Sequence, residues 1–177
     1  SWSSRSDLPS MTAHKTSAWP LAQAYAMLIV YASLYPFDGW RAQGLAPWAF
    51  MASPWPRWWT GFDIAANVAG YAPLGFLIAL ARLRRDPLAG GPRGALLVAL
   101  AACAGLSFLM EALQTFLPVR VPSNLDFGLN TAGGLAGAIL AAGLERLGLL
   151  QLALLGGLWR VSQTSAPVRA ATEADTE

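Results

Sequence analysis

Four stretches of this sequence are too long and too apolar for a soluble protein of its size to bury. Each has about 20 residues, the length that a helix needs to cross the hydrocarbon core of a bilayer. The stretches cover residues 19–37, 64–83, 95–117 and 125–144, and none contains more than one charged side chain. The sequence therefore predicts an all-α membrane protein that forms a four-transmembrane-helix bundle.

The composition of the 177-residue chain agrees with this class and argues against several others. Apolar residues make up 55% of the chain and charged residues only 12%, against about 25% charged residues in a typical soluble domain. A net charge of +2 is too small for a nucleic-acid-binding surface. The single cysteine, Cys103, excludes an intrachain disulfide and a thiolate metal site. We expect no cofactor, no bound metal and no nucleic-acid partner.

The distribution of Lys and Arg predicts the orientation of the bundle. Nine of the twelve lie in the N-terminal tail, in the connection between the second and third stretches, or in the C-terminal part. Only Arg41, Arg57 and Arg120 lie in the other two connections. Because cytoplasmic loops carry an excess of positive charge, both termini are predicted to be cytoplasmic (N-in/C-in).

Three further segments flank the predicted membrane domain, which covers residues 18–147. Residues 1–17 form a polar tail that we expect on the cytoplasmic side. Residues 148–160 are apolar but too few to span a bilayer, which predicts a short C-terminal interfacial helix. Residues 161–177 are predicted to be disordered or bound to a partner.

The connection between the first two stretches, residues 38–61, is rich in tryptophan and proline. Its aromatic and cyclic residues are Trp40, Trp48, Trp55, Trp58, Trp59, Pro47, Pro54 and Pro56. Prolines at this density prevent a regular helix throughout, and tryptophan favours the headgroup level of a bilayer. We expect an outer loop that lies along the membrane. A lid or a partner-docking surface is the alternative.

Polar side chains gather at the predicted outer ends of the second, third and fourth stretches, where hydrocarbon would reject them. Spacings of three and four residues place those within one stretch on a shared helix face. The members of this polar cluster are Asp63, Asn67, Ser107, Glu111, Gln114, Arg120, Ser123, Asp126 and Asn130.

Glu111 is the member that is hardest to explain by packing alone. A carboxylate at that depth costs about 2–3 kcal/mol even on permissive insertion scales, so it must face the bundle interior and find a partner, or stay protonated. We expect Arg120 as its counter-ion, with Gln114 and Asn130 as hydrogen-bond partners. Two interpretations remain open, a functional pocket or a closed polar network that locks the bundle.

Several members also have a purely structural interpretation. Asp63 could cap the second helix, and Asp126 could complement the dipole of the fourth helix from its first turn. Ser123 or Asn124 could cap that same helix. The amides of Asn67 and Asn130 could join neighbouring helices.

Small residues predict where two helices pack closely. Gly133, Gly134 and Gly137 form overlapping small-xxx-small patterns with Ala138 in the fourth stretch, which allow another backbone to approach. Pro73 should kink the second helix beside Asn67 and open space near the polar cluster.

These residues, in this order, resemble the VanZ-like family of small bacterial membrane proteins over about residues 18–147. The matching positions are Ser33-Leu34-Tyr35-Pro36, Asp63-x3-Asn67, Pro73-Leu74-Gly75, Ser107-x3-Glu111-x2-Gln114, Arg120, Ser123, Asp126-x3-Asn130-x2-Gly133 and Gly137. The resemblance implies a multi-pass protein of the bacterial cytoplasmic membrane. The founding member of the family is linked to low-level teicoplanin resistance, but the family has no settled biochemical activity. The resemblance therefore implies a fold and a site rather than a reaction.

Three classes of function remain open at this stage. The cluster could bind a membrane lipid or a lipid-linked envelope precursor, with Arg120 as an anion clamp. The chain could instead be an accessory subunit of a larger membrane protein complex, or a transporter or proton relay built on the buried acid. An enzyme is less favoured, because the bundle has no histidine and no nucleophile paired with a base.

Cysteine labelling of intact cells tests the predicted orientation. In a background without Cys103, a cysteine at Gly44 or Ser123 should react with an impermeant thiol reagent, because both positions lie on the outer side. A cysteine at Gly90 should not react. Reversed labelling would show that the polar cluster lies in the inner leaflet.

Overall fold

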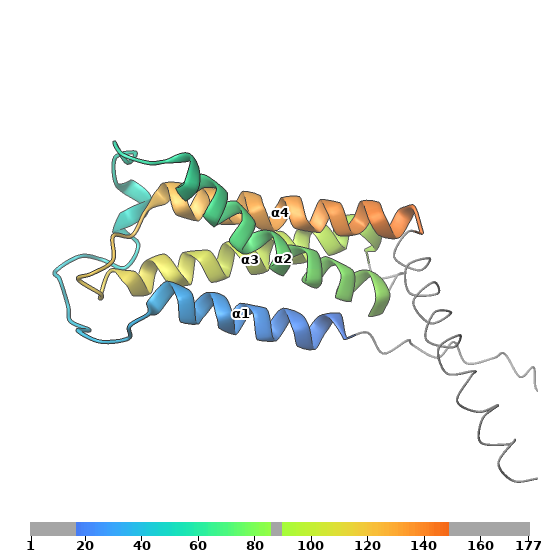
Figure 1. Ribbon diagram of the computed structural model, residues 1–177, viewed down its shortest axis with the longest axis horizontal. Helices are drawn as coiled ribbons and strands as arrows, with labels where there is room; N and C mark the ends of the chain where they lie inside the picture. The colour runs from blue at the N-terminus through green and yellow to red at the C-terminus, as the bar shows by residue number, and fades with distance from the viewer. Residues whose placement is uncertain (1–16, 86–89, 149–177) are drawn as a thin grey trace, which may run out of the picture.

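The computed structural model describes residues 17–85 and 90–148, and this part of the chain is helical, without strands. The elements are α1 (Ala18–Leu34), the short 3-10 helix η1 (Ala49–Ala52), α2 (Gly61–Arg85), α3 (Gly91–Gln114) and α4 (Asn124–Arg146). Figure 1 shows the four α-helices side by side along one axis. The predicted all-α class is confirmed. The predicted interfacial helix over residues 148–160 and the two terminal tails lie outside the described residues, apart from Gly148 and Ser17.

Three of the four helices are long and apolar enough to cross a membrane. These are α2, α3 and α4, with 25, 24 and 23 residues. Helix α1 is apolar but has only 17 residues, a rise of about 26 Å against about 30 Å of hydrocarbon. The fourth span and the orientation therefore stay predictions.

Prolines explain why two helices end earlier than their apolar stretches. Helix α1 ends at Leu34 rather than at residue 37, because the residue before Pro36 is driven out of the helical conformation. Helix α3 ends at Gln114 rather than at residue 117. There the chain tightens into turns, with Phe116 N–H bonded to the Leu113 carbonyl at 3.0 Å, before Pro118 prevents further helix.

Helices α2 and α4 pack backbone to backbone through glycine. A Cβ atom built on Gly133 would lie 2.8 Å from Val68 Cα, and one on Gly137 would lie 2.7 Å from the Ala72 carbonyl carbon. On the other side of the contact, a Cβ on Gly75 would lie 2.6 Å from the Gly134 carbonyl carbon. No side chain fits in these positions, so the closeness of the two helices depends on glycine.

At their C-terminal ends, α2 and α4 are also joined by a salt bridge. Arg84 Nη2 lies 3.2 Å from Glu145 Oε2, and Arg84 Nε donates to Glu145 Oε1 at 3.3 Å. Both side chains are partly buried. The pair fastens the C-terminal ends of α2 and α4 to each other.

Residues 35–60, between α1 and α2, are fastened across the ends of α3 and α4. Phe50 of η1 is buried against Phe108 and Phe127, with ring centroids 5.5 and 6.3 Å away. Asn124 Nδ2 donates to the Ser53 carbonyl at 2.7 Å. These contacts give the loop a defined path, and we call the end of the bundle that carries it the loop end.

The five tryptophans of this loop share one feature, exposure at the protein surface. Each is exposed, and Trp58 is the most exposed of them, at 91%. This arrangement suits the predicted contact with the headgroup layer, which itself stays a prediction.

The glycine contact between α2 and α4 generates a stability test. Gly137→Leu should destabilise the bundle by about 3 kcal/mol, because overpacking against a backbone forces the helices apart. The measurement is thermal unfolding of the full chain in detergent. Gly143→Leu is the matched control in the same helix, since nothing lies within 4 Å of a Cβ at that position. Equal melting of both variants would contradict the packing described above.

Candidate functional site

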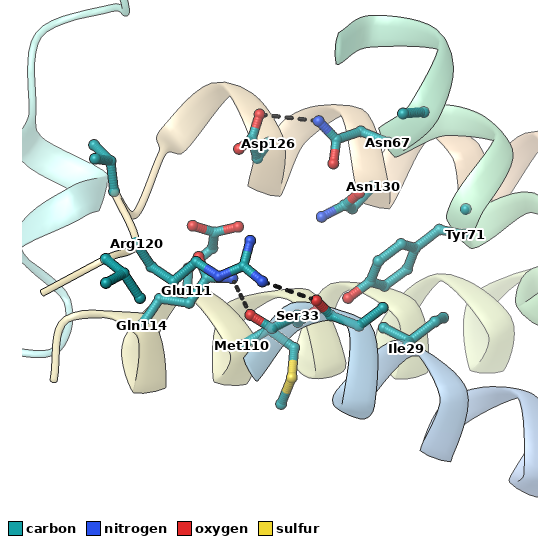
Figure 2. A pocket seen from close by; sticks show the side chains of 15 residues that line it. Ile29, Ser33, Asn67, Tyr71, Met110, Glu111, Gln114, Arg120, Asp126 and Asn130 are labelled. Atoms are coloured by element: carbon teal, nitrogen blue, oxygen red, sulfur yellow. Dashed lines mark hydrogen bonds between the residues drawn. The ribbon is translucent and has the colours of Figure 1, made fainter. Parts of the chain in front are cut away.

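A pocket of about 410 Å³ lies inside the loop end of the bundle, between residues of all four helices and of the α3–α4 connection. Figure 2 shows the side chains that line it. Of the predicted polar cluster, the pocket brings together Asn67, Glu111, Gln114, Arg120, Asp126 and Asn130. Asp63, Ser107 and Ser123 are not among the lining residues.

On one side of the pocket, α2 and α4 are joined by an amide and a carboxyl group. Asn67 Nδ2 donates to Asp126 Oδ1 at 3.0 Å and to the Asp63 backbone carbonyl at 3.1 Å. Figure 2 shows Asn67 and Asp126 facing each other across the two helices. The glycine contact further along α2 and α4 brings these two faces within hydrogen-bonding distance.

Asp63 serves the start of α2 rather than the pocket. Its Oδ2 accepts hydrogen bonds from the Thr60 backbone N–H at 2.7 Å and from the Thr60 hydroxyl at 2.8 Å. In return, the Asp63 N–H donates to Thr60 Oγ1 at 3.2 Å. This reciprocal pattern is a capping box. The contacts of Asp63 therefore match the interpretation that it caps the second helix.

Ser123 caps α4 and also meets the buried acid. Its Oγ accepts hydrogen bonds from the N–H groups of Leu125 and Asp126 at 3.2 and 3.3 Å. Its own backbone N–H donates to Glu111 Oε2 at 2.8 Å. Glu111, which is 3% exposed, therefore lies at the N-terminal end of α4, where the helix dipole favours a negative charge.

The structure corrects the expected partners of Glu111. Arg120 Nη2 donates to the backbone carbonyls of Ala32 and Tyr35, at 3.1 and 2.8 Å, and not to Glu111. The cause is the end of α1, whose last carbonyls have no intrahelical donor and whose dipole favours a cation.

The two amides that we expected beside Glu111 also have other partners. Gln114 Nε2 donates to the Ser33 carbonyl at 3.0 Å, which again serves the end of α1. Asn130 Nδ2 donates to the Ser107 hydroxyl at 3.1 Å. The closed network around Glu111 is therefore not formed within the described residues.

The deep wall of the pocket holds two buried polar atoms that have no partner among the described residues. They are Oδ1 of Asn130 and the hydroxyl of Tyr71, which lies near the Ser107 hydroxyl without a well-formed hydrogen bond to it. Tyr71 is 4% exposed and Asn130 is 6% exposed. Sequence reasoning missed Tyr71, because an aromatic residue in an apolar run is typical of packing; its position four residues after Asn67 was the available signal.

The described residues offer no prebuilt metal centre. Among them, no three acidic, histidine or cysteine side chains lie close enough together to hold a metal ion. The polar groups that line the pocket are two carboxyl groups, one guanidinium group, amides and hydroxyls.

Fold and pocket together define a small helical protein with three membrane-capable helices and a polar pocket at one end of the bundle. A family model described as VanZ/LLP1 matches residues 7–147. The chain belongs to this family, which confirms the resemblance inferred from the motifs. Searches among curated proteins and among solved structures each gave no match.

The role of Arg120 at the end of α1 can be tested by hydrogen exchange. Hydrogen bonds to charged groups contribute about 1.5–3 kcal/mol, so Arg120→Gln should speed amide exchange over residues 33–37 by about tenfold or more. Arg41→Gln is the control, because that arginine is exposed in the same loop end. Unchanged exchange in the Arg120 variant would contradict this role.

Proposed function

We propose that the pocket binds the polar headgroup of a membrane lipid or of a lipid-linked envelope precursor. In the predicted N-in/C-in orientation, the pocket belongs to the outer leaflet. The ligand would place its anionic phosphate near Arg120 and its acyl chains along the apolar outer faces of the helices. No reaction is part of this proposal.

The observation that carries the proposal is the pair of unpartnered polar atoms in a pocket of about 410 Å³. Leaving a buried donor or acceptor without a partner costs about 1–3 kcal/mol per group. A polar network that served only to lock the bundle would satisfy the Tyr71 hydroxyl and Asn130 Oδ1 internally. A ligand that supplies the missing partners accounts for both the space and the unpaired atoms.

Arg120 is suited to hold a phosphate at the mouth of the pocket. An arginine has five N–H donors, and both hydrogen bonds of the Arg120 side chain to described residues come from Nη2. Nε and Nη1 remain for a ligand. The neighbouring Val119 and Val121 are strongly exposed, so this part of the lining lies at the protein surface.

The tryptophan-rich loop supports a second candidate, an accessory subunit that packs against a larger membrane protein complex. Its exposed aromatic side chains are of the type that is enriched at protein interfaces. The same side chains suit the headgroup layer equally well, so the pocket is the more specific basis for a function.

Gly70 offers a way to fill the pocket without touching its polar groups. It lines the pocket, and nothing lies within 4 Å of a Cβ built on it. Gly70→Leu should therefore keep the fold, since leucine favours a helix more than glycine does, and should exclude the ligand.

The measurement is native mass spectrometry of the full chain with a defined mixture of phosphatidylethanolamine and phosphatidylglycerol. Wild type should retain lipid, and Gly70→Leu should retain about tenfold less, which corresponds to about 1.4 kcal/mol. Gly105→Leu is the matched control, because Gly105 is an exposed glycine of α3 with equally open surroundings. Equal lipid retention by wild type and both variants would contradict the proposed function.

A further inference from the structure

We infer that the headgroup carries a protonated primary amine beside its phosphate, with the amine at Glu111 and Asp126 and the phosphate at Arg120. This inference rests on the proposed function and names the ligand class for the same pocket. It is drawn from the charges of the lining, from the hydrogen-bonding atoms that remain free, and from the position of the two poles.

The charges of the pocket lining do not cancel. Glu111 and Asp126 contribute two carboxyl groups, and Arg120 contributes the one cationic side chain of the lining. Arg120 forms no ion pair with either acid; the salt bridge found among the described residues joins Arg84 and Glu145 at the other end of the bundle. A nearby cation stabilises the ionised form of a buried carboxyl group. The interior of the pocket therefore favours a ligand group with positive charge.

The hydrogen-bonding atoms of the lining that have no partner also favour a positively charged ligand group. Among the described residues, the Glu111 carboxyl group accepts one hydrogen bond, at Oε2, and that of Asp126 accepts one, at Oδ1. Their second oxygens and the buried Oδ1 of Asn130 have no hydrogen-bond partner among the described residues. These atoms can only accept when the acids are ionised, and a primary ammonium group offers three donors and no acceptor.

A headgroup needs both a positive charge and N–H donors to match the pocket. A glycerol headgroup brings hydroxyl donors but no positive charge, so it leaves the carboxylates unpaired. A trimethylammonium headgroup brings the charge but no N–H donor, so it leaves the acceptors unpaired. An ammonium group that follows a phosphate meets both demands.

Figure 2 shows that Arg120 and Asp126 reach into the pocket from different sides. The Arg120 guanidinium lies beside the end of α1, next to Ser33, whereas Asp126 and Asn130 project from α4 on the other side. Glu111 reaches in from α3, and in this view its carboxyl group lies beside the Arg120 guanidinium. A headgroup with its phosphate and amine at opposite ends spans this arrangement.

The test compares three lipids with identical acyl chains on the full chain in detergent. They are phosphatidylethanolamine, phosphatidylcholine and phosphatidylglycerol, and the readout is retention in native mass spectrometry. Phosphatidylethanolamine should be retained at least about tenfold better than either of the others, a difference of about 1.4 kcal/mol. Stronger retention of phosphatidylglycerol or phosphatidylcholine would overturn the amine while leaving the lipid pocket in place.

Two variants link the preference to the acids. Glu111→Gln and Asp126→Asn keep a carbonyl oxygen that can accept from Ser123 N–H and Asn67 Nδ2, so both should fold. Each should lose the preference for phosphatidylethanolamine over phosphatidylglycerol. Glu145→Gln is the matched control at the other end of α4 and should keep it. A preference that persists in both pocket variants would overturn the inference.

A competition experiment with a soluble compound distinguishes a lipid ligand from a free metabolite that carries the same amine and phosphate groups. Phosphoethanolamine should compete with phosphatidylethanolamine, but only at much higher concentration, because it has no acyl chains to contact the helices. Competition at equal concentration would support the amine and phosphate poles and overturn the membrane lipid as ligand. Retention of none of the three lipids by wild type would overturn the proposed function itself.

Discussion

The loop end of this protein is organised by helix termini that need partners from other helices. Where a helix ends among apolar side chains, its free N–H and carbonyl groups cannot rely on water. The end of α1 takes donors from Arg120 and Gln114. The start of α4 is served by Ser123, whose own N–H is bound by Glu111. These bonds hold α1, α3 and α4 together around the pocket.

This use of the polar side chains determines the electrostatics of the pocket. Had Arg120 paired with Glu111, the two charges would have cancelled and the cluster could have closed on itself. Because Arg120 serves the carbonyls of α1 instead, Glu111 and Asp126 line the pocket without an ion pair among the described residues. The free acceptor atoms are thus a direct consequence of how the termini are satisfied, and they carry the proposal of a headgroup with an amine.

Much of the architecture was predictable from the sequence, but the pairing of side chains was not. The apolar stretches predicted the helices because the hydrophobic requirement acts on each segment separately, and the spacing of Asn67, Asp126 and Asn130 indicated a shared site. The partner of Arg120 depends on where the end of α1 lies relative to the α3–α4 connection. That position is a property of the packed bundle, as is the burial of the Tyr71 hydroxyl.

Glycine has two opposite effects in this bundle, and the pocket depends on both. Gly133 and Gly137 remove side chains where α4 meets the backbone of α2, which brings Asn67 within 3.0 Å of Asp126. Gly70, one turn beyond Asn67 on α2, removes a side chain where nothing else fills the space. Close contact on one face of α2 and open space on another therefore follow from the same missing Cβ atom. The open space beside Gly70 belongs to the pocket, which α1 also lines. The end of α1 is held at the loop end by hydrogen bonds to its carbonyl groups. In this way α1 forms the far wall of the pocket without closing on Gly70.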